Sequence, residues 1–256
     1  MIAYVSGAFD NVRSDDIRFL ECAASVGPLT VALWSDEAVA SATGKLPKFP
    51  MVERQYFLES IRFVSRVVSG VDADFRLDPA GAARVHRQHD ARGDEAFVVA
   101  ESLLNEFPPP EPMPVAPSTE RKRVLVTGSF DWFHTGHVRF FEEVSQLGDL
   151  YVVVGHDANI ALLKGAGHPM FPAAERCYVA GSIRFARLAV VSTGHGWLDA
   201  EPEIERLQPH IYAVNEDGDR PEKRDYCRAH GIEYVVLSRA PRPGLPARAS
   251  TALRGF

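Results

Sequence analysis

Cysteine, long apolar runs and an excess of one charge are all scarce in this sequence, and each shortage argues against a class of protein. The three cysteines among 256 residues, Cys22, Cys177 and Cys227, are too few and too scattered for a disulfide framework or a structural zinc site. No apolar run reaches the roughly 20 residues that span a bilayer, and the first ten residues lack the basic and apolar regions of a signal peptide. The 28 lysines and arginines against 34 aspartates and glutamates give a net charge of −6, which offers nucleic acid no broad basic surface. We therefore expect a cytoplasmic protein with no nucleic-acid partner and no membrane span.

Proline, by contrast, is concentrated in one place, because six of the 18 prolines lie within residues 108–117. Proline fixes φ and lacks an N–H donor, so this segment is expected to be an extended, semi-rigid spacer. A long surface loop inside one domain is the alternative, and structureless loops of that length are uncommon. The sequence thus predicts domains at residues 1–106 and 122–256, joined by a proline-rich linker at residues 107–121.

The two sides of this linker resemble each other. Val5-Ser-Gly-Ala-Phe-Asp10 matches Val126-Thr-Gly-Ser-Phe-Asp131, and Ser60-Ile-Arg-Phe63 matches Ser182-Ile-Arg-Phe185 at nearly the same offset. Ordered matches with a single one-residue gap indicate a duplicated unit.

Strand-like and helix-like patterns alternate in the second unit, which indicates βαβ units and a buried parallel sheet. We expect strands at residues 124–127, 150–154, 188–191, 210–214 and 234–237, and helices at 138–147, 175–184 and 221–230. The predicted fold class is α/β, with two tandem Rossmann-like units. The first unit is expected to be truncated, lacking at least one strand–helix element and the C-terminal segment, because far fewer residues follow Val68 than follow Val191.

Two histidines, His134 and His137, lie three residues apart where the first strand of the second unit leads into its first helix. Backbone N–H groups and the helix dipole favour an anion at that place, and imidazoles can donate hydrogen bonds to phosphate oxygens. A pair of structural histidines is the alternative. Half of a metal site is another, but no third ligand stands at the required spacing, so we expect no protein-held metal.

These residues carry a resemblance to a known family. Gly128-Ser-Phe-Asp131 followed by His134-Thr-Gly-His137 resembles the HxGH signature of the cytidylyltransferase-like nucleotidyltransferases, and Arg248-Ala-Ser-Thr-Ala-Leu-Arg254 resembles their second signature. Lys164-Gly165 lies between them, in a loop where the family carries a catalytic lysine. The tandem arrangement is similar to that of phosphoethanolamine cytidylyltransferases.

The resemblance implies transfer of CMP from CTP to a small phosphorylated alcohol or polyol, with release of pyrophosphate and with Mg²⁺ on the triphosphate. Transfer of AMP to a sugar phosphate, as in heptose-phosphate adenylyltransferases, is one alternative. A non-catalytic nucleotide-binding sensor or scaffold is another.

The resemblance also assigns roles to individual residues. Catalytic roles fall to His134, His137 and Lys164. Contacts to the nucleotide and its phosphates fall to Gly128, Ser129, Phe130, Asp217, Ser250, Thr251 and Arg254. Weaker candidates for substrate contacts are Asp131, Trp132, Arg176 and Arg184, for which core packing or a structural ion pair is the alternative.

The first unit lacks this machinery. Arg13-Ser-Asp-Asp16 stands where the second unit has its histidine pair, and Thr43 stands where it has Lys164. Two carboxylates at a helix start repel phosphate, so we expect the first unit to be catalytically inactive. It is expected to serve as the internal partner of a pseudo-dimer, with a further homodimer as an additional assembly. The alternative is that Asp15 and Asp16 form a new ligand site.

Overall fold

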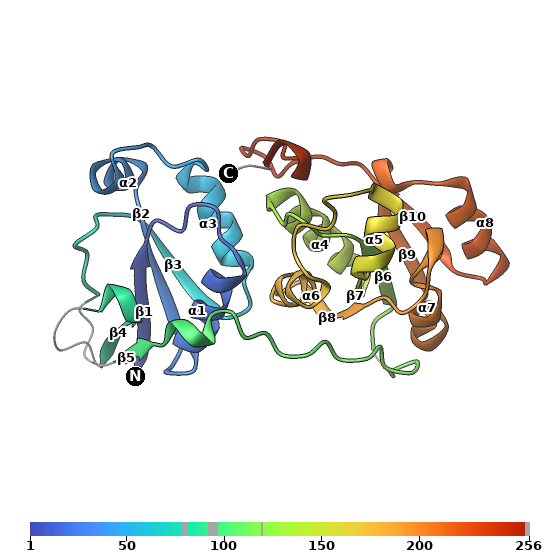
Figure 1. The fold of residues 1–256 in the computed structure, drawn as a ribbon, viewed down its shortest axis with the longest axis horizontal. Helices are drawn as coiled ribbons and strands as arrows, with labels where there is room; N and C mark the ends of the chain where they lie inside the picture. The colour runs from blue at the N-terminus through green and yellow to red at the C-terminus, as the bar shows by residue number, and fades with distance from the viewer. Residues whose placement is uncertain (78–80, 92–96, 119, 254–256) are drawn as a thin grey trace. The chain divides into compact units, whose positions relative to one another are not determined.

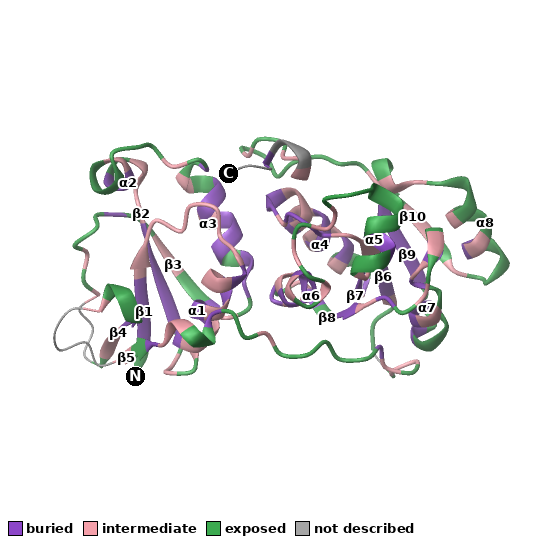
Figure 2. Ribbon diagram, in the orientation of Figure 1, coloured by how far each residue is buried: buried purple, intermediate pink, exposed green. Residues whose placement is uncertain are grey.

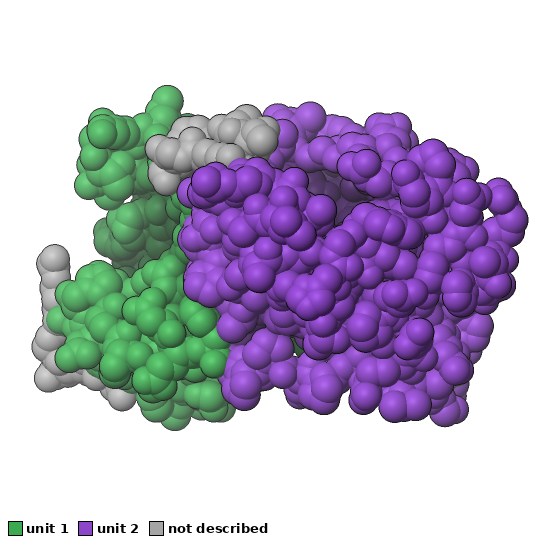
Figure 3. Space-filling model, turned by 45° about the vertical axis from the view of Figure 1, so that its right-hand side comes forward, with its two compact units in different colours: residues 1–107 green, residues 108–256 purple. Residues whose placement is uncertain are grey.

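The computed structural model describes residues 1–77, 81–91, 97–118 and 120–253, with the side chains of residues 251 and 252 left out. The chain divides into two compact units, residues 1–107 and 108–256, which Figure 3 shows in different colours. Each unit contains one sheet of five strands, all of them parallel (Figure 1). This confirms the predicted α/β class with two Rossmann-like units.

In the first unit, the strand order is β3-β2-β1-β4-β5. Its elements in chain order are β1 (Ile2–Gly7), α1 (Ser14–Ala24), β2 (Leu29–Trp34), α2 (Asp36–Thr43), α3 (Met51–Ser60), β3 (Val64–Val71), β4 (Ala82–Arg87), the 3-10 turn η1 (Gln88–Asp90), β5 (Phe97–Val99) and the 3-10 turn η2 (Glu101–Leu103).

In the second unit, the corresponding order is β8-β7-β6-β9-β10, read from the opposite edge. Its elements are β6 (Arg123–Gly128), α4 (Thr135–Leu147), β7 (Asp149–Val154), α5 (Asp157–Lys164), α6 (Ala173–Gly181), β8 (Ala186–Val191), η3 (Gly196–Leu198), α7 (Glu201–Leu207), β9 (Ile211–Asn215), η4 (Glu216–Gly218), α8 (Pro221–Ala229), β10 (Glu233–Leu237) and η5 (Ser250–Leu253).

The strands and helices predicted for the second unit are confirmed, with ends that differ by a few residues. Helices α5 and α7 were not predicted, because both are short and their apolar patterns are weak. The first unit keeps five strands, so the expected loss of a strand–helix element falls on its helices and not on its strands. What differs is the crossovers: in the described parts of residues 72–107, no α-helix follows β3, whereas α7 and α8 follow β8 and β9 in the second unit.

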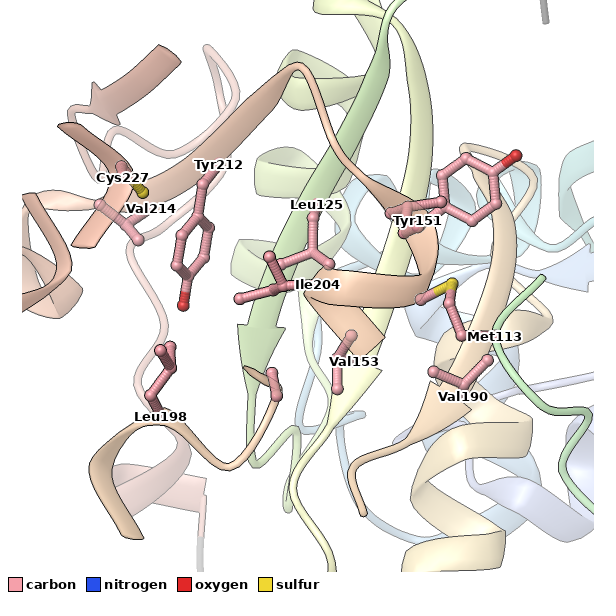
Figure 4. Close-up of a cluster of buried hydrophobic side chains, with 12 residues drawn as sticks. Met113, Leu125, Tyr151, Val153, Val190, Leu198, Ile204, Tyr212, Val214 and Cys227 are labelled. Atoms are coloured by element: carbon pink, nitrogen blue, oxygen red, sulfur yellow. The ribbon is translucent and has the colours of Figure 1, made fainter. Parts of the chain in front are cut away.

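A hydrophobic cluster covers one face of the second sheet (Figure 4). Leu125, Val153 and Tyr212 from the strands pack there against Ile204 of α7 and other buried side chains. Side chains alternate between the faces of a strand, so Val124 and Val126 point to the other face, which α4 and α6 cover. Figure 2 shows β2, β7 and β9 as mostly buried, whereas the edge strands β3 and β10 are largely exposed or half-buried. Burial of both faces is typical of parallel sheets and explains the continuous apolar runs in the sequence.

The proline-rich segment has no regular secondary structure from residue 106 to residue 114, as expected from its composition. Part of it nevertheless packs on the second unit. Met113 is 2% exposed within the hydrophobic cluster, and its carbonyl accepts a 2.8 Å hydrogen bond from Nε of Arg206. The backbone N–H of Ala116 donates to the carbonyl of Arg206. The buried Met113 side chain and the two hydrogen bonds with Arg206 anchor this segment to α7.

Across the described part of the chain, no helix is both long enough and apolar enough to cross a membrane.

Candidate active site

The loops that follow β6, β7, β8 and β9 converge at the carboxyl ends of the strands of the second sheet. From β6 the chain runs through β7 to β8 on one side of the sheet, and it then crosses to β9 on the other side of β6. Open α/β sheets bind ligands where the strand order reverses in this way. A cavity of about 490 Å³ opens at this edge, which we call the Lys164 cavity. Its wall includes Ser129, Lys164, Trp197, Asp199, Arg220 and Lys223.

A second cavity, of about 320 Å³, lies beside the start of α4. We call it the Arg248 cavity. Thr135 and Gly136 of the HxGH segment line it, together with Asn215 at the end of β9 and Arg239 and Arg248 from the segment after β10. The segment from Gly128 to Gly136 therefore contributes to the walls of both cavities, with its first residues on one and its last on the other.

The histidine pair belongs to this connecting segment. The imidazole ring centres of His134 and His137 are 4.1 Å apart, although neither ring is among the lining residues of the two cavities. His134 is the N-cap of α4, and its Nδ1 accepts a 3.0 Å hydrogen bond from the N–H of Gly136. Its Nε2 and Nδ1 of His137 are buried and have no hydrogen-bond partner among the described residues. Because Nδ1 of His134 accepts, its Nε2 carries the proton and is a donor without an acceptor.

Both imidazoles are neutral at pH 7. Burial, helped by the positive charges of Arg239 and Arg248, lowers the pKa of His134 to about 4. Burial together with His134, Arg239 and Lys164 lowers the pKa of His137 well below its ordinary value. The pair therefore contributes hydrogen bonds rather than charge, and the positive field that disfavours its protonation favours an anion at the same place.

Lys164 is the last residue of α5, which corrects the expectation of a loop. Helix α5 ends there because Gly165 has a φ of 86°, a left-handed value that glycine adopts without strain. The Lys164 side chain is exposed, and its Nζ donates a 2.7 Å hydrogen bond to Oγ of Ser129. Lys164 and Ser129 thus form one polar group on the wall of the Lys164 cavity.

Two glycines in the connecting segment are required by neighbouring rings. A Cβ on Gly128 would lie 2.9 Å from the Phe130 ring, so the absence of a side chain makes room for Phe130 rather than for a nucleotide. Phe130 is 6% exposed and packs against Phe133, His137 and Phe141, which makes its side chain part of the core beneath the histidines. A Cβ on Gly136 would lie 2.8 Å from Cε1 of His134.

The C-terminal signature reaches the same segment. Oγ of Ser250 donates a 3.2 Å hydrogen bond to the carbonyl of Trp132, and the carbonyl of Arg248 lies 3.6 Å from the position of a Cβ on Gly136. Of the other two residues predicted there, the Thr251 side chain and Arg254 lie outside the described residues.

Asp217 follows β9, but its carboxylate is paired with Arg239, at 2.5 Å from NH1. A second bond from Arg239, from NH2, goes to the carbonyl of Arg248 at 3.3 Å. Arg239 was missed in the sequence analysis. Its signal was its place directly after the last predicted strand, at the carboxyl edge of a parallel sheet.

Of the four weaker candidates for substrate contacts, three are buried and one is exposed at the other end of the sheet. Asp131 is 7% exposed and accepts hydrogen bonds from the N–H groups of Met170 and Phe171, and Trp132 is 5% exposed. Arg176 is 1% exposed and bonds to main-chain carbonyls of the loops after β6 and β7. Arg184 is exposed just before β8 begins, at the sheet edge opposite the cavities. The geometry therefore brings none of these four guanidinium, indole or carboxylate groups to an open position at the site.

Several polar residues of the Lys164 cavity were also missed: Asn159, Trp197, Asp199, Arg220 and Lys223. They follow three different strands, so only the order of the strands reveals that they share one cavity. Asn159 is 1% exposed and has both ends of its amide bonded to the backbone of Gly196. It shapes the cavity without an open donor or acceptor, whereas the other four leave charge or ring surface on the wall.

In the first unit, the start of α1 holds an ion pair where the second unit holds histidines. Arg87, at the end of β4, contacts Asp15 at 3.1 Å and is also bonded to Asp16. Burial and the neighbouring Asp15 carboxylate raise the pKa of Asp16 to about 6, against the opposing effect of Arg87. The unit thus presents its own carboxylates at this helix start.

Among the described residues, no three or more His, Cys, Asp or Glu side chains are grouped so that they could hold a metal ion.

A family model described as cytidylyltransferase-like matches residues 125–239. An FAD synthase from Thermococcus kodakarensis is 33% identical over 118 residues, which cover 45% of this chain and 77% of that protein. A bifunctional protein HldE from Azotobacter vinelandii is 34% identical over 121 residues, which cover 45% of this chain and 24% of that protein. A solved lipopolysaccharide core biosynthesis protein from Thermoplasma volcanium is 22% identical, with a TM-score of 0.40, over 47% of this chain and 98% of that one. With a relative matched over most of its length and the signature residues in place, the chain belongs to the cytidylyltransferase-like family of nucleotidyltransferases.

Proposed function

We propose that the second unit transfers a nucleoside monophosphate group from a triphosphate to a small phosphorylated acceptor. The observation that carries this proposal is the neutral histidine pair, whose buried ring nitrogens lie in the positive field of Lys164, Arg239 and Arg248. Donors aimed at developing negative charge, with cations around them, are what phosphoryl transfer requires from a protein.

In this reaction, a phosphate oxygen of the acceptor attacks the α-phosphorus of the triphosphate. The bond from the α-phosphorus to the bridging oxygen breaks, and the electron pair leaves with pyrophosphate. Nε2–H of His134 and the ring of His137 hydrogen-bond the α-phosphate, while Arg239 and Arg248 bind the oxygens of the leaving pyrophosphate. Lys164 binds the acceptor's phosphate beside Ser129. Mg²⁺ enters as the complex with the triphosphate, in which phosphate oxygens supply its ligands.

The two cavities give the substrates separate places. The nucleotide occupies the Arg248 cavity, and the acceptor extends into the Lys164 cavity, so the reacting phosphates meet at the segment between them. For the nucleoside, the sequence motifs predicted CTP. The FAD synthase relatives favour ATP instead, because FAD contains an adenylyl group. We therefore place ATP first and keep CTP as the alternative.

The first unit contributes no chemistry in this proposal. Its role as the internal partner of a pseudo-dimer remains a prediction, as does further association of two chains.

The experiment measures pyrophosphate release by the full chain with Mg·ATP and with Mg·CTP, each offered with FMN, sugar 1-phosphates, glycerol 3-phosphate and phosphoethanolamine. We expect release with one triphosphate that depends on one acceptor. His137→Ala should lower that turnover by a factor of about 100, because it removes a hydrogen-bonding ring nitrogen from the transition state. The matched control is Asp16→Ala at the corresponding place in the first unit, which should leave turnover unchanged.

Two outcomes would contradict the proposal. Tight nucleotide binding with no turnover for any acceptor would favour a sensor. Equal losses in the His137 and Asp16 variants would mean that the histidine pair is not the reacting centre.

A further inference from the structure

We propose that the acceptor carries a second anionic group, at the end remote from its reacting phosphate, and that Lys223 with Arg220 binds it. This inference rests on the proposed function, because it assigns the two ends of the Lys164 cavity to the two ends of one acceptor. It names a substrate class, a phosphorylated hydroxy acid or a bisphosphate, in place of the phosphorylated neutral or cationic alcohols that the sequence motifs resemble.

The cationic side chains of this cavity come from two different helices. Lys164 comes from the end of α5 and is bonded to Ser129 in the loop after β6. Arg220 and Lys223 come from the N-cap and first turn of α8, which follows β9. Strands β7 and β9 lie on opposite sides of β6, so Lys164 and the pair Arg220 and Lys223 are separated across this middle strand. The reacting phosphate at Lys164 therefore leaves Arg220 and Lys223 available for a second anion.

Lys223 is held in place rather than extended into solvent. Its Nζ donates a 3.3 Å hydrogen bond to the carbonyl of Gly218 and lies 5.7 Å from the centre of the Tyr212 ring. The Tyr212 hydroxyl is bonded to Oγ1 of Thr127 at 2.7 Å, and Thr127 also lines the cavity. An ammonium group has three donors, so the bond to Gly218 leaves capacity for a ligand.

The charge of Lys223 is only partly compensated. Burial and the neighbouring Arg220 lower its pKa, while Asp199 acts in the opposite direction. A half-buried cation beside a second cation gains stability from a bound anion, and a cationic head group at this place would meet like charges. Glu222 and Asp199 also line this cavity, so the preference for a carboxylate or phosphate over an amine applies to the part of the wall beside Arg220 and Lys223.

Asp199 adds a recognition element for the middle of the acceptor. Its Oδ2 accepts a 2.7 Å hydrogen bond from Oγ of Ser192, which fixes the carboxylate on the cavity wall. A carboxylate accepts several hydrogen bonds, so Asp199 can take those of an acceptor hydroxyl. Asn159, whose amide is committed to Gly196, offers no such contact. An acceptor with hydroxyl groups between two anionic ends would therefore match the cavity, in which Asp199 accompanies cations at both ends.

The test compares ligands that differ only at the remote end. Isothermal titration of the full chain, with a non-hydrolysable ATP analogue present, gives the Kd of 3-phosphoglycerate, of glycerol 3-phosphate and of phosphoethanolamine. The first two differ by a carboxylate in place of a CH2OH group. We expect 3-phosphoglycerate to bind about tenfold tighter than glycerol 3-phosphate, and phosphoethanolamine to bind weakest. Glycerol 1,3-bisphosphate, which carries a phosphate in place of the carboxylate at the remote end, distinguishes a second phosphate from a carboxylate as the preferred group.

The variants assign the preference to Lys223. Lys223→Met should remove the preference for 3-phosphoglycerate while leaving the Kd of glycerol 3-phosphate within about twofold, and Lys223→Arg should retain it. The matched control is Lys122→Met, which removes an exposed lysine paired with Glu233 at the opposite edge of the same sheet. It should change none of the Kd values.

Equal Kd values for the first three ligands, tightest binding of phosphoethanolamine, or no binding of 3-phosphoglycerate and of glycerol 1,3-bisphosphate would overturn the inference. So would an equal loss for all ligands in Lys223→Met. These failures are distinct from failure of the proposed function. Pyrophosphate release that depends on His137 but not on Lys223 would leave the nucleotidyl transfer intact, whereas absence of binding of any triphosphate would remove it.

Discussion

Arg54 and Arg176 make the same set of hydrogen bonds in the two units of this chain. Each donates through Nε to a phenylalanine carbonyl five residues before it and through NH1 to the loop after the first strand. Each also donates through NH2 to a carbonyl at the end of the second strand and to an aspartate just beyond it. The partners of Arg54 are Phe49, Ala8, Trp34 and Asp36, and those of Arg176 are Phe171, Ser129, Gly155 and Asp157. The first unit keeps this network without a histidine pair, so support of the fold is sufficient to explain it.

Arg176→Met should therefore destabilise the second unit. The change leaves buried carbonyls of Phe171, Ser129 and Gly155 without their donor, which costs about 3 kcal/mol of unfolding free energy. Urea unfolding followed by tryptophan fluorescence, in a Trp34→Phe background, reports on Trp132 and Trp197 of this unit alone.

The matched variant for this prediction is Arg54→Met. It should destabilise the first unit by a similar amount and leave the second unit's fluorescence transition where it was. A stable Arg176→Met protein that had lost only nucleotide binding would instead give Arg176 a ligand-binding role.

Acid should destabilise the second unit through His134. The folded unit takes up a proton on His134 at a pKa of about 4, and the unfolded chain takes one up near 6.5. The unfolded state therefore binds more protons between these values, so stability is complete above about pH 6.5 and falls as the pH drops toward 4, by about 3 kcal/mol over the window.

Urea midpoints measured from pH 4 to pH 8 check this behaviour. His134→Asn retains a residue that caps helices well but has no titratable group, so its stability should vary less over that window. A wild-type midpoint that rises on acidification would show that the sign is wrong.

Gly136→Ala should disturb the site without unfolding the helix. Alanine favours a helix over glycine, but its Cβ would lie 2.8 Å from Cε1 and 2.9 Å from Nδ1 of His134. The ring must then leave its bond to the N–H of residue 136, and we expect turnover to fall about tenfold or more because the donor is misplaced. Gly181→Ala, where the added Cβ meets Ala189 at 3.4 Å, is the control and should retain both stability and turnover. A fully active Gly136→Ala enzyme would mean that His134 need not hold this position.

Substitutions of Asp217 and of Arg239 should differ in their effect on nucleotide affinity. Arg239→Gln removes a cation near the histidine pair and should weaken triphosphate binding about tenfold, with a smaller dependence on salt than in the wild type. Asp217→Asn releases Arg239 from its 2.5 Å ion pair and should leave the affinity equal or tighter. Fluorescence titration with the triphosphate at two salt concentrations measures both. A large loss of affinity in Asp217→Asn would show that Asp217 contacts the nucleotide itself.

Most of the second unit's fold was predictable from local patterns. Continuous apolar runs such as Leu150–Val154 mark strands buried on both faces, and spaced apolar residues such as Val138, Phe141 and Val144 mark α4. The fifth strand of the first unit was not predictable in this way. Strand β5 spans only Phe97–Val99, too short for a periodic pattern, and it forms because β4 offers an open edge.

In the candidate site, too, some features follow from the sequence and others only from the tertiary structure. The duplicated motif and the place of His134 and His137 at the start of a helix are properties of the sequence, because short-range spacing marks where that helix begins; Lys164 was recognised by its motif, and its place at the end of α5 was not predicted. The convergence of Arg239 on the histidine pair, and of Lys223 with Lys164 on one cavity, was decided only by the tertiary structure. Each pair joins residues about 60 to 100 positions apart, and their proximity depends on the order in which the strands pair, a choice made by packing both faces of the sheet rather than by any local run of residues.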